Sequence, residues 1–504
     1  MGLVTTQDAS PTPGGAERMR PLNNAAYLAA ANLGARVFTL LLAIYTLRKL
    51  DTLYGDYVVI ISFVGLFAVV TDLGLSTVTV RDVVQDRSLE ARYLSNALVL
   101  RLAFTVLDIA LIAALGQVFI RADLRLALDV YAVSLIPSTV SGTLQLAFQI
   151  TERQTYSAAL SIATTAARVA LSLAVLYTGH HVLALTLVYT AVTATSALAT
   201  VWLVYTRFPA LRIELDLSWW PDLLRRALPF GVLLLLNYFY ASIDMFILYV
   251  LSGCKSNVGC VQTAQYGAAY QVLNVVIAIF ATSISAAILP ALNRVAVESH
   301  AALARMVRSS YTLMLVFGVP IALFTTFYAP VALHLLAGRH NAANFGAAAP
   351  ALAILIWDLP CFLITNMLGT ALLAVHRQTT LMVSFAVTLV FNVAFNVLLI
   401  PHYSYMASSV LTVASEFVNG VIILRALRQA IGPLWLGSTT VRVAVIAIVT
   451  AVALWVLQPY GIVIGLPVGA IGALLGLRVA RVLGPTERDV LGRLPLVGRY
   501  VGLL

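Results

Sequence analysis

Fourteen apolar runs, each close to the length of a membrane-spanning helix, dominate this chain of 504 residues. A helix needs about 20 mostly apolar residues to cross the hydrocarbon core of a bilayer. Hydrophobic residues make up 61% of the chain and charged residues 10%, against about 45–50% and about 25% in soluble domains. Single water-soluble cores stop growing near about 250–300 residues, so they cannot hide this much apolar surface. The sequence therefore excludes a soluble enzyme, a nucleic-acid-binding protein and a disordered scaffold, and predicts an all-α polytopic membrane protein.

The runs follow one another with short polar loops between them, and the longest polar connection, Thr206–Leu228, follows the sixth. This spacing divides the chain into a tail (1–21), an N-lobe of helices one to six (22–205), a cytoplasmic linker (206–228), a C-lobe of helices seven to twelve (229–430), and a last part with helices thirteen and fourteen and a cytoplasmic tail (431–504). The expected spans are Asn24–Leu47, Gly55–Leu75, Leu94–Leu115, Tyr131–Ile150, Tyr156–Tyr177, Val182–Tyr205, Pro229–Ser252, Ala264–Pro290, Tyr311–Leu336, Ala347–Val375, Thr380–Ile400, Met406–Leu427, Val441–Leu457 and Ile462–Leu483.

The distribution of basic residues tests this layout. The net charge is +10, and nearly all basic residues are Arg in short clusters between apolar runs. Of the 31 Lys and Arg residues, 22 lie in the tails and the loops on one side, 6 lie in the opposite loops, and 3 lie inside spans. Because loops rich in Lys and Arg stay on the cytoplasmic side, the pattern predicts a cell-membrane protein with both termini in the cytoplasm.

An internal repeat relates the two lobes. Leu53–Tyr57 opens the second span and Gln265–Ala269 opens the eighth, an offset of 212 residues. A six-helix unit used twice in the same orientation is the parallel-repeat plan of alternating-access transporters. The loops are too short to fold as catalytic domains, and the sequence contains no Gly-x-x-x-x-Gly-Lys-Ser/Thr motif for binding phosphates. We therefore expect two pseudo-symmetric six-helix bundles plus two C-terminal helices, acting as a transporter and not an enzyme, without a cofactor or metal.

Short motifs from the first span to the eleventh resemble one family. They are Asn24–Leu47, Tyr54-Gly55, Thr71–Ser76 with Arg81, Arg226–Phe230 on to Asp244, Tyr266–Tyr270 with Leu289-Pro290, Asn344-Phe345 and Asn392–Pro401. In these motifs the chain resembles the polysaccharide or oligosaccharide flippases of the MOP exporter superfamily. The resemblance implies translocation of a polyprenyl-(di)phosphate-linked oligosaccharide or polysaccharide repeat unit across the cytoplasmic membrane by alternating access. Its partners would be the lipid-linked glycan, membrane lipids and glycan assembly enzymes.

The chain departs from the family pattern in two places. After Ile400-Pro401 the family usually has a Gly-rich turn, whereas this chain has Tyr403–Tyr405. Lipid II flippases usually carry an Arg-Asp pair late in the first helix, whereas an apolar run follows Arg36 here. These differences favour an oligosaccharide-lipid flippase. The alternatives are an H⁺- or Na⁺-coupled multidrug exporter of the MATE type, a lipid II flippase and a membrane-embedded lipid-modifying enzyme.

Three arginines, Arg36, Arg101 and Arg168, lie inside the expected N-lobe spans. A charged side chain at the bilayer centre costs at least about 2.5–3.5 kcal/mol, so it normally faces a polar cavity or a partner. The planar guanidinium binds phosphate oxygens bidentately and stays protonated. All three are therefore candidates for holding the phosphate of a lipid-linked sugar. The other interpretation is structural ion pairing, for which Asp108, two turns after Arg101 on the same helix face, is a partner.

Acidic residues also lie inside the spans. Asp244 in the seventh span and Asp108 in the third are candidates for coupling transport to H⁺ or Na⁺, or for an ion-pair latch between the lobes. Asp358 and Glu416 are candidates for lining a cavity in the C-lobe, with helix packing or backbone capping as the alternative. Asp72, near the end of the second span, is interpreted as a turn residue.

The cysteines indicate a local cross-link. Cys254 and Cys260 lie six residues apart in the loop before the eighth span and are candidates for a disulfide in an oxidising compartment. Cys361 falls in the tenth span and is interpreted as structural. Three cysteines are too few for a disulfide framework or a thiolate metal site.

Overall fold

The computed structural model of the chain describes residue 34 and residues 38–179, 181–207, 214–254, 260–338, 341–484 and 487, with the side chains of 279–291, 293–294, 296–298 and 342–343 left out. Throughout these ranges the chain forms α-helices and short 3-10 turns and no β-strand. After a helix over residues 38–50 come α2 (Leu53–Ala68), α3 (Leu75–Gln85), α4 (Glu90–Phe119), α5 (Ala122–Val133), α6 (Leu135–Ile150), α7 (Gln154–Tyr177), α8 (Val182–Arg207), α9 (Trp220–Leu251), α10 (Val261–Glu298), α11 (His300–Ala337), α12 (Ala342–Gly346), α13 (Ala349–Leu355), α14 (Asp358–Ala374), α15 (Gln378–Tyr403), α16 (Tyr405–Ile431), α17 (Gly437–Leu457) and α18 (Ile462–Val479).

The number of spans agrees with the sequence. In the described part of the chain, eleven helical segments are long and apolar enough to cross a membrane, and the pair Asn344–Leu355 and Asp358–Ala374, bent by 41°, adds a twelfth. The helix over 38–50 and the 38-residue α10 lie where the first and eighth spans are expected. The prediction of an all-α polytopic fold with about fourteen spans is thereby confirmed. The second, fourth and tenth expected spans are each broken into shorter helices.

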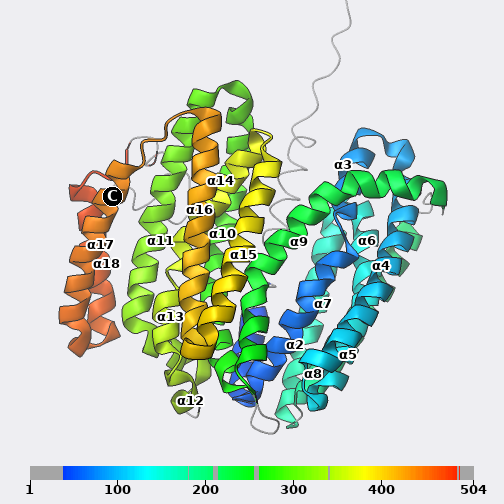
Figure 1. Ribbon diagram of the computed structural model, residues 1–504, viewed down its shortest axis with the longest axis horizontal. Coiled ribbons are helices and arrows are strands. Elements are labelled where there is room, and N and C mark those ends of the chain that lie inside the picture. The colour runs from blue at the N-terminus through cyan, green and yellow to red at the C-terminus, as the bar shows by residue number, and fades with distance from the viewer. Residues whose placement is uncertain are drawn as a thin grey trace, which may run out of the picture.

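The helices form two bundles that stand side by side (Figure 1). In this view α2–α8 form the N-lobe on the right, and α10–α16 form the C-lobe on the left. α9 begins across the N-lobe, contacts α3 there, and then descends between the bundles against α2 and α15. α17 and α18 lie on the outer side of the C-lobe, where both contact α11.

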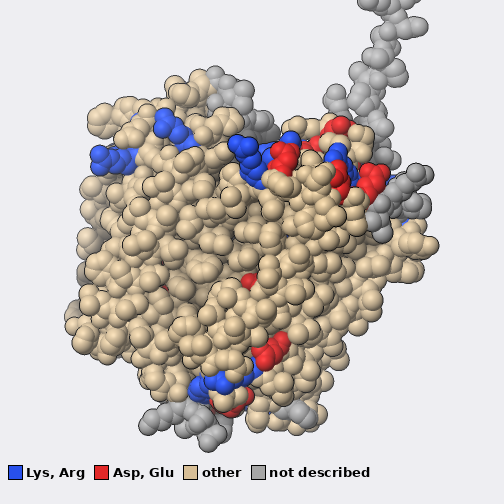
Figure 2. All heavy atoms as spheres, turned by 45° about the vertical axis from the view of Figure 1, so that its right-hand side comes forward, with Lys and Arg blue, Asp and Glu red and all other residues tan. Residues whose placement is uncertain are grey.

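Most of the charge on the surface lies toward the two ends of the molecule. On the face shown in Figure 2, Lys, Arg, Asp and Glu gather mainly at the upper and lower ends, and other residues form most of the broad band between them. We call the upper end, which carries the connection into α9, the linker end, and the lower end, which carries Cys254 and Cys260, the disulfide end. Such a band matches the hydrocarbon region of a bilayer, where polar backbone groups must be satisfied within helices.

The second span breaks where α9 crosses it. Leu73 and Gly74 have positive φ angles of 41° and 81°. A Cβ on Gly74 would lie 2.5 Å from the Ala227 carbonyl oxygen, so glycine permits both the left-handed backbone and the close approach of α9. Asp72 Oδ1 accepts hydrogen bonds from the Ser76 amide (3.1 Å) and hydroxyl (2.6 Å), which fixes the start of α3. Asp72 is therefore a turn residue, as expected.

The linker is tied to the N-lobe before α9 begins. Asp216 accepts hydrogen bonds from Ser218 and from Arg92, and these bonds hold the pKa of the Asp216 carboxyl below its usual range. The Arg92 guanidinium also lies over the Trp219 ring, 4.8 Å from its centroid. Because α9 already starts at Trp220, its first turns lie within the expected linker 206–228.

The two lobes touch closely at the disulfide end. A Cβ on Gly55 of α2 would lie 2.3 Å from the Cys260 carbonyl oxygen at the start of α10, so only glycine fits this contact. The helix over 38–50 adds a second contact, because Arg48 donates from Nε to the Leu336 carbonyl oxygen (3.0 Å). Asn344 donates to both carboxylate oxygens of Asp51 (2.9 and 2.8 Å). Contacts between the N-lobe and the C-lobe therefore close this end of the molecule.

We expect Gly55→Ala to loosen the contact between the lobes, because the new methyl group would collide with backbone atoms of α10. Spin labels on cysteines at Tyr177 of α7 and Tyr403 of α15, both exposed, would report the separation of the lobes. The distance distribution should shift to longer values. Gly65→Ala on the same helix is the control, because its Cβ would meet one Tyr238 atom at 3.7 Å, an ordinary contact. An unchanged distribution for Gly55→Ala would show that this contact does not hold the lobes together.

Candidate functional site

Two adjoining cavities lie at the junction of the lobes. The first, of about 310 Å³, lies between the helix over 38–50, α2, α9 and α10, and we call it the interlobe cavity. The second, of about 370 Å³, lies among α9, α10, α14, α15 and α16, and we call it the C-lobe cavity. Asp244, Tyr270 and Asn274 line both. Cavities of this size are typical of sites for small organic ligands.

Asp244 is fixed from within the C-lobe. It is buried, and its Oδ2 accepts hydrogen bonds from the Tyr266 hydroxyl on α10 and from Thr412 on α16 (3.1 Å). Among the described residues no arginine or lysine forms an ion pair with Asp244. The structure therefore joins Asp244 to hydroxyl groups of its own lobe, and a latch to an N-lobe arginine is not seen in this part of the chain.

Glu416 and Asp358 face the C-lobe cavity from α16 and α14. Glu416 is buried and accepts hydrogen bonds from Tyr240 on α9 and Thr365 on α14, so it joins three helices. Asp358 is the first residue of α14 after the bend at Trp357, and its Oδ1 has no hydrogen-bond partner in the described part of the protein. Both acids line the C-lobe cavity, and a role for them in binding stays a prediction.

Arg101 is bound by its neighbours. Its Nε lies 3.2 Å from Asp72 Oδ1, and its Nη1 donates to Ser76 (3.0 Å) and Thr143 (2.8 Å). The partner of Arg101 is thus Asp72 from the broken second span, and not Asp108 two turns along its own helix. Asp108 is 2% exposed, and neither of its carboxylate oxygens has a hydrogen-bond partner in the ranges described.

Arg168 lies in an aromatic setting. Its guanidinium carbon is 4.6 Å from the centroid of the Tyr189 ring. Tyr189 in turn packs against Tyr131, with the two ring centroids 4.6 Å apart. Arg168 Nε is buried without a hydrogen-bond partner in the described chain. Arg36 lies outside the described residues.

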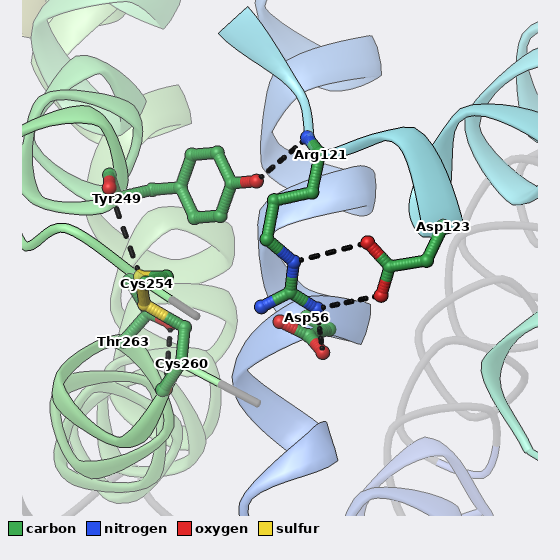
Figure 3. Close-up of a disulfide and its surroundings, with 7 residues drawn as sticks. All are labelled: Asp56, Arg121, Asp123, Tyr249, Cys254, Cys260 and Thr263. Carbon is green, nitrogen blue, oxygen red and sulfur yellow. Dashed lines mark hydrogen bonds and ion pairs between the residues drawn. A yellow bond between two sulfur atoms is a disulfide. The ribbon is translucent and has the colours of Figure 1, made fainter. Parts of the chain in front are cut away.

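Figure 3 shows the disulfide end in detail. Cys254 and Cys260 form a disulfide, which ties the end of α9 to the start of α10. Arg121, between α4 and α5, donates from its guanidinium to Asp56 (2.9 Å) and Asp123, and from its backbone amide to the hydroxyl of Tyr249 on α9 (3.1 Å). The disulfide therefore lies beside a polar network that joins both lobes.

The comparisons with known proteins agree with this architecture. The sequence profile of the polysaccharide biosynthesis protein family matches residues 22–296, more than half of the chain. The chain belongs to this family. The profile of the lipid II flippase MurJ matches residues 236–466. No curated protein matches the sequence. The predicted membership of the MOP flippases is confirmed, and the family is one of transporters and not of enzymes.

Solved structures carry the same fold. A lipid II flippase MurJ in an inward closed conformation has a TM-score of 0.73 at 10% identity, over 90% of this chain and 99% of that one. A MOP superfamily transporter from Pyrococcus furiosus has 0.57 at 15% identity, over 84% and 99%. A MATE transporter of Vibrio cholerae has 0.53 at 13% identity, over 81% and 97%. At these identities the likeness concerns the fold alone.

Several polar residues of this flippase-family chain were missed by sequence reasoning. Tyr189 lies against Arg168 and packs on Tyr131, and Tyr240 and Thr365 donate hydrogen bonds to Glu416. Tyrosine and threonine are also common in spans without a site. The recurrence of Tyr54-Gly55 and Tyr266-Gly267 was noticed as a repeat. Its meaning as the crossing point of α2 and α10 required the structure.

We expect Arg101→Ala to destabilise the protein, because it removes the ion partner of Asp72 and leaves a mostly buried carboxylate. Removing one member of a buried pair costs about 3–5 kcal/mol, and partial exposure of Asp72 reduces this to about 2–3 kcal/mol. Thermal unfolding in detergent and abundance in membranes would measure the loss. Arg87→Ala, at an exposed arginine of the linker end, is the control.

The double variant Asp72→Ala with Arg101→Ala should lose less stability than the two single variants added together. Normal stability of Arg101→Ala combined with lost transport would instead assign Arg101 to substrate binding.

Proposed function

We propose that the protein moves a polyprenyl-(di)phosphate-linked oligosaccharide or polysaccharide repeat unit across the cytoplasmic membrane by alternating access. The observation that carries this proposal is a pair of adjoining cavities, one between the two lobes and one within the C-lobe, whose walls include buried acidic residues. Membership of the polysaccharide biosynthesis protein family supports a glycan as the cargo. The glycan would occupy the cavities while the prenyl chain stays in lipid, and glycan assembly enzymes would supply the substrate.

In this proposal the phosphate is held by N-lobe arginines. Arg168 is the best described candidate, since its Nε is buried without a described hydrogen-bond partner and its guanidinium lies against the Tyr189 ring. Arg36 lies three residues before Thr39, which lines the same cavity. Arg101 is already engaged by Asp72, so its guanidinium has less capacity for a phosphate.

Asp244 is the proposed coupling residue, with H⁺ or Na⁺ as the driving ion. It lines both cavities, and the Tyr266 and Thr412 hydroxyls that bind its carboxylate come from two different helices. A change in the charge of this carboxylate would alter contacts among α9, α10 and α16 together. Asp108 is a second candidate, because it is buried without a described partner.

Lipid II is a second candidate substrate. The MurJ profile covers residues 236–466, and MurJ shares the fold over most of the chain. A reconstituted flippase assay with lipid II and with a polyprenyl diphosphate oligosaccharide lacking the peptide separates the two substrates. Transport of the oligosaccharide lipid at a rate equal to or above that of lipid II supports the first proposal.

The proposed orientation places both termini and the linker end in the cytoplasm, because 22 basic residues lie in the loops and tails of that side. In a chain whose native cysteines are replaced, a cysteine at Ser88 should react with an impermeant thiol reagent only after the cells are permeabilised. A cysteine at Gln458, at the disulfide end, should react in intact cells. Labelling of the cysteine at Ser88 in intact cells would show that the protein has the opposite orientation.

Arg168→Ala should reduce transport by about ten-fold or more while leaving protein abundance near normal. A charge-assisted hydrogen bond contributes about 1.5–3 kcal/mol, and no described ion pair would be broken. Arg168→Lys should keep part of the activity, since it keeps the charge and loses the planar fork. Transport in proteoliposomes and abundance in membranes are measured together. Tyr189→Phe keeps the ring under the guanidinium and is the control; unimpaired transport by Arg168→Ala would remove Arg168 from the mechanism.

A further inference from the structure

The C-lobe cavity presents uncharged polar groups from three different helices. Asn237 of α9, Asn274 of α10 and Asn366 of α14 have exposed side chains that line it. Tyr240 of α9 stacks against Phe385 of α15 at the same wall, with the ring centroids 6.2 Å apart. Amides offer both donors and acceptors, and aromatic rings offer flat apolar faces. Sugars present hydroxyl groups at their edges and C–H groups on their faces, so this lining is complementary to a sugar ring.

The charged groups of the C-lobe cavity are all acidic. Asp244, Asp358 and Glu416 line it, and the described residues of its wall include no Lys, Arg or His. A ligand with a carboxylate or sulfate would therefore meet three carboxyl groups and no described counter-charge. Burying a charge without a counter-charge is costly, which counts against acidic ligands here.

Two buried acceptors at this wall lack a donor. Asp358 Oδ1 and Asn419 Oδ1 have no hydrogen-bond partner in the described structure, and the two residues are 5% and 2% exposed. Both residues line the C-lobe cavity from different helices. A buried acceptor without a partner is costly, so a ligand that brings a hydrogen-bond donor is favoured. Hydroxyl and amine groups are such donors, whereas carboxylate groups are acceptors only.

The acidic residues of the C-lobe cavity fit a metal ion less well than they fit a sugar. In the described part of the chain, no group of three or more His, Cys, Asp or Glu side chains lies close enough to hold a metal. Asp244 and Glu416 are already bound by hydroxyl groups of the protein. The two acceptors without a described partner, Asp358 Oδ1 and Asn419 Oδ1, belong to different helices, α14 and α16.

We propose that the C-lobe cavity is the glycan subsite of this transporter, and that it accepts neutral or amine-bearing sugars and rejects acidic sugars. This inference rests on the proposed function. Asp358 is the residue that sets the preference, because its buried carboxyl group lies in the wall of the cavity, where no described cation would balance an acidic sugar. The phosphate of the same substrate lies toward the N-lobe arginines, so the two ends of the substrate are bound by groups of opposite charge.

The test uses three lipids with the same polyprenyl diphosphate, carrying glucose, glucosamine or glucuronic acid. The purified full chain is reconstituted into vesicles, and flipping is followed by access of membrane-impermeant periodate to the sugar. Glucose and glucosamine lipids should move at similar rates, and the glucuronic acid lipid about ten-fold more slowly or worse. Equal rates for the glucose and glucuronic acid lipids would overturn the proposal.

Two variants locate the preference in the cavity. Asp358→Asn should narrow the ratio of glucose to glucuronic acid transport, because it keeps an acceptor and removes the charge. Asn366→Lys supplies a counter-charge at an exposed position and should raise transport of the glucuronic acid lipid. Asp222→Asn makes the same chemical change as Asp358→Asn at an exposed residue of α9, far from the cavity, and should leave all three rates unchanged.

Two other outcomes separate this inference from its rivals. Asp358→Asn could slow transport of all three lipids equally, and the unmodified protein could transport them in Na⁺ buffer but not in K⁺ buffer. That result would assign Asp358 to ion coupling and would overturn the glycan subsite. If no lipid moves, the flippase proposal fails. Competition among the three lipids for binding to the detergent-solubilised protein then decides the subsite alone, with weak binding of the glucuronic acid lipid supporting it and equal binding overturning it.

Discussion

The hydrocarbon core of a bilayer offers no hydrogen-bond partner, so polar groups inside this protein must find their partners within the protein. The backbone is satisfied by helices, and charged side chains need a partner or a cavity. Arg101 is matched by Asp72, and Glu416 by hydroxyl groups from two helices. Asp244 is matched in the same way. The buried groups without a described partner are therefore candidates for binding a substrate or an ion.

Unmatched charged groups lie in both lobes. In the N-lobe, Arg168 Nε and both carboxylate oxygens of Asp108 are buried without a described hydrogen-bond partner, and in the C-lobe the same holds for Asp358 Oδ1. A lipid-linked glycan is itself divided, because its phosphate is an anion and its sugars carry hydroxyl donors. Arg168 would suit the phosphate and the wall of the C-lobe cavity would suit the sugars, with Asp244 lining both cavities.

Much of this architecture could be predicted from local pattern. Apolar runs of about 20 residues gave the spans, because span length is fixed by the bilayer and not by tertiary contacts. The disulfide between Cys254 and Cys260 followed from short spacing in a polar loop. The partner of Arg101 could not be found in this way. Asp108 shares its helix face, but the break at Leu73 and Gly74 brings Asp72 to it from another span. Tyr189, which lies against Arg168 of α7, belongs to α8, so no spacing within one span reveals this contact.

The disulfide between α9 and α10 has a consequence for how the chain enters the membrane. The two sulfur atoms lie in one short loop, and they join only if that loop reaches an oxidising environment. A chain inserted with the opposite polarity would leave both thiols in a reducing compartment, and the bond would not form. The presence of the disulfide therefore reports the orientation in which each molecule was inserted into the membrane.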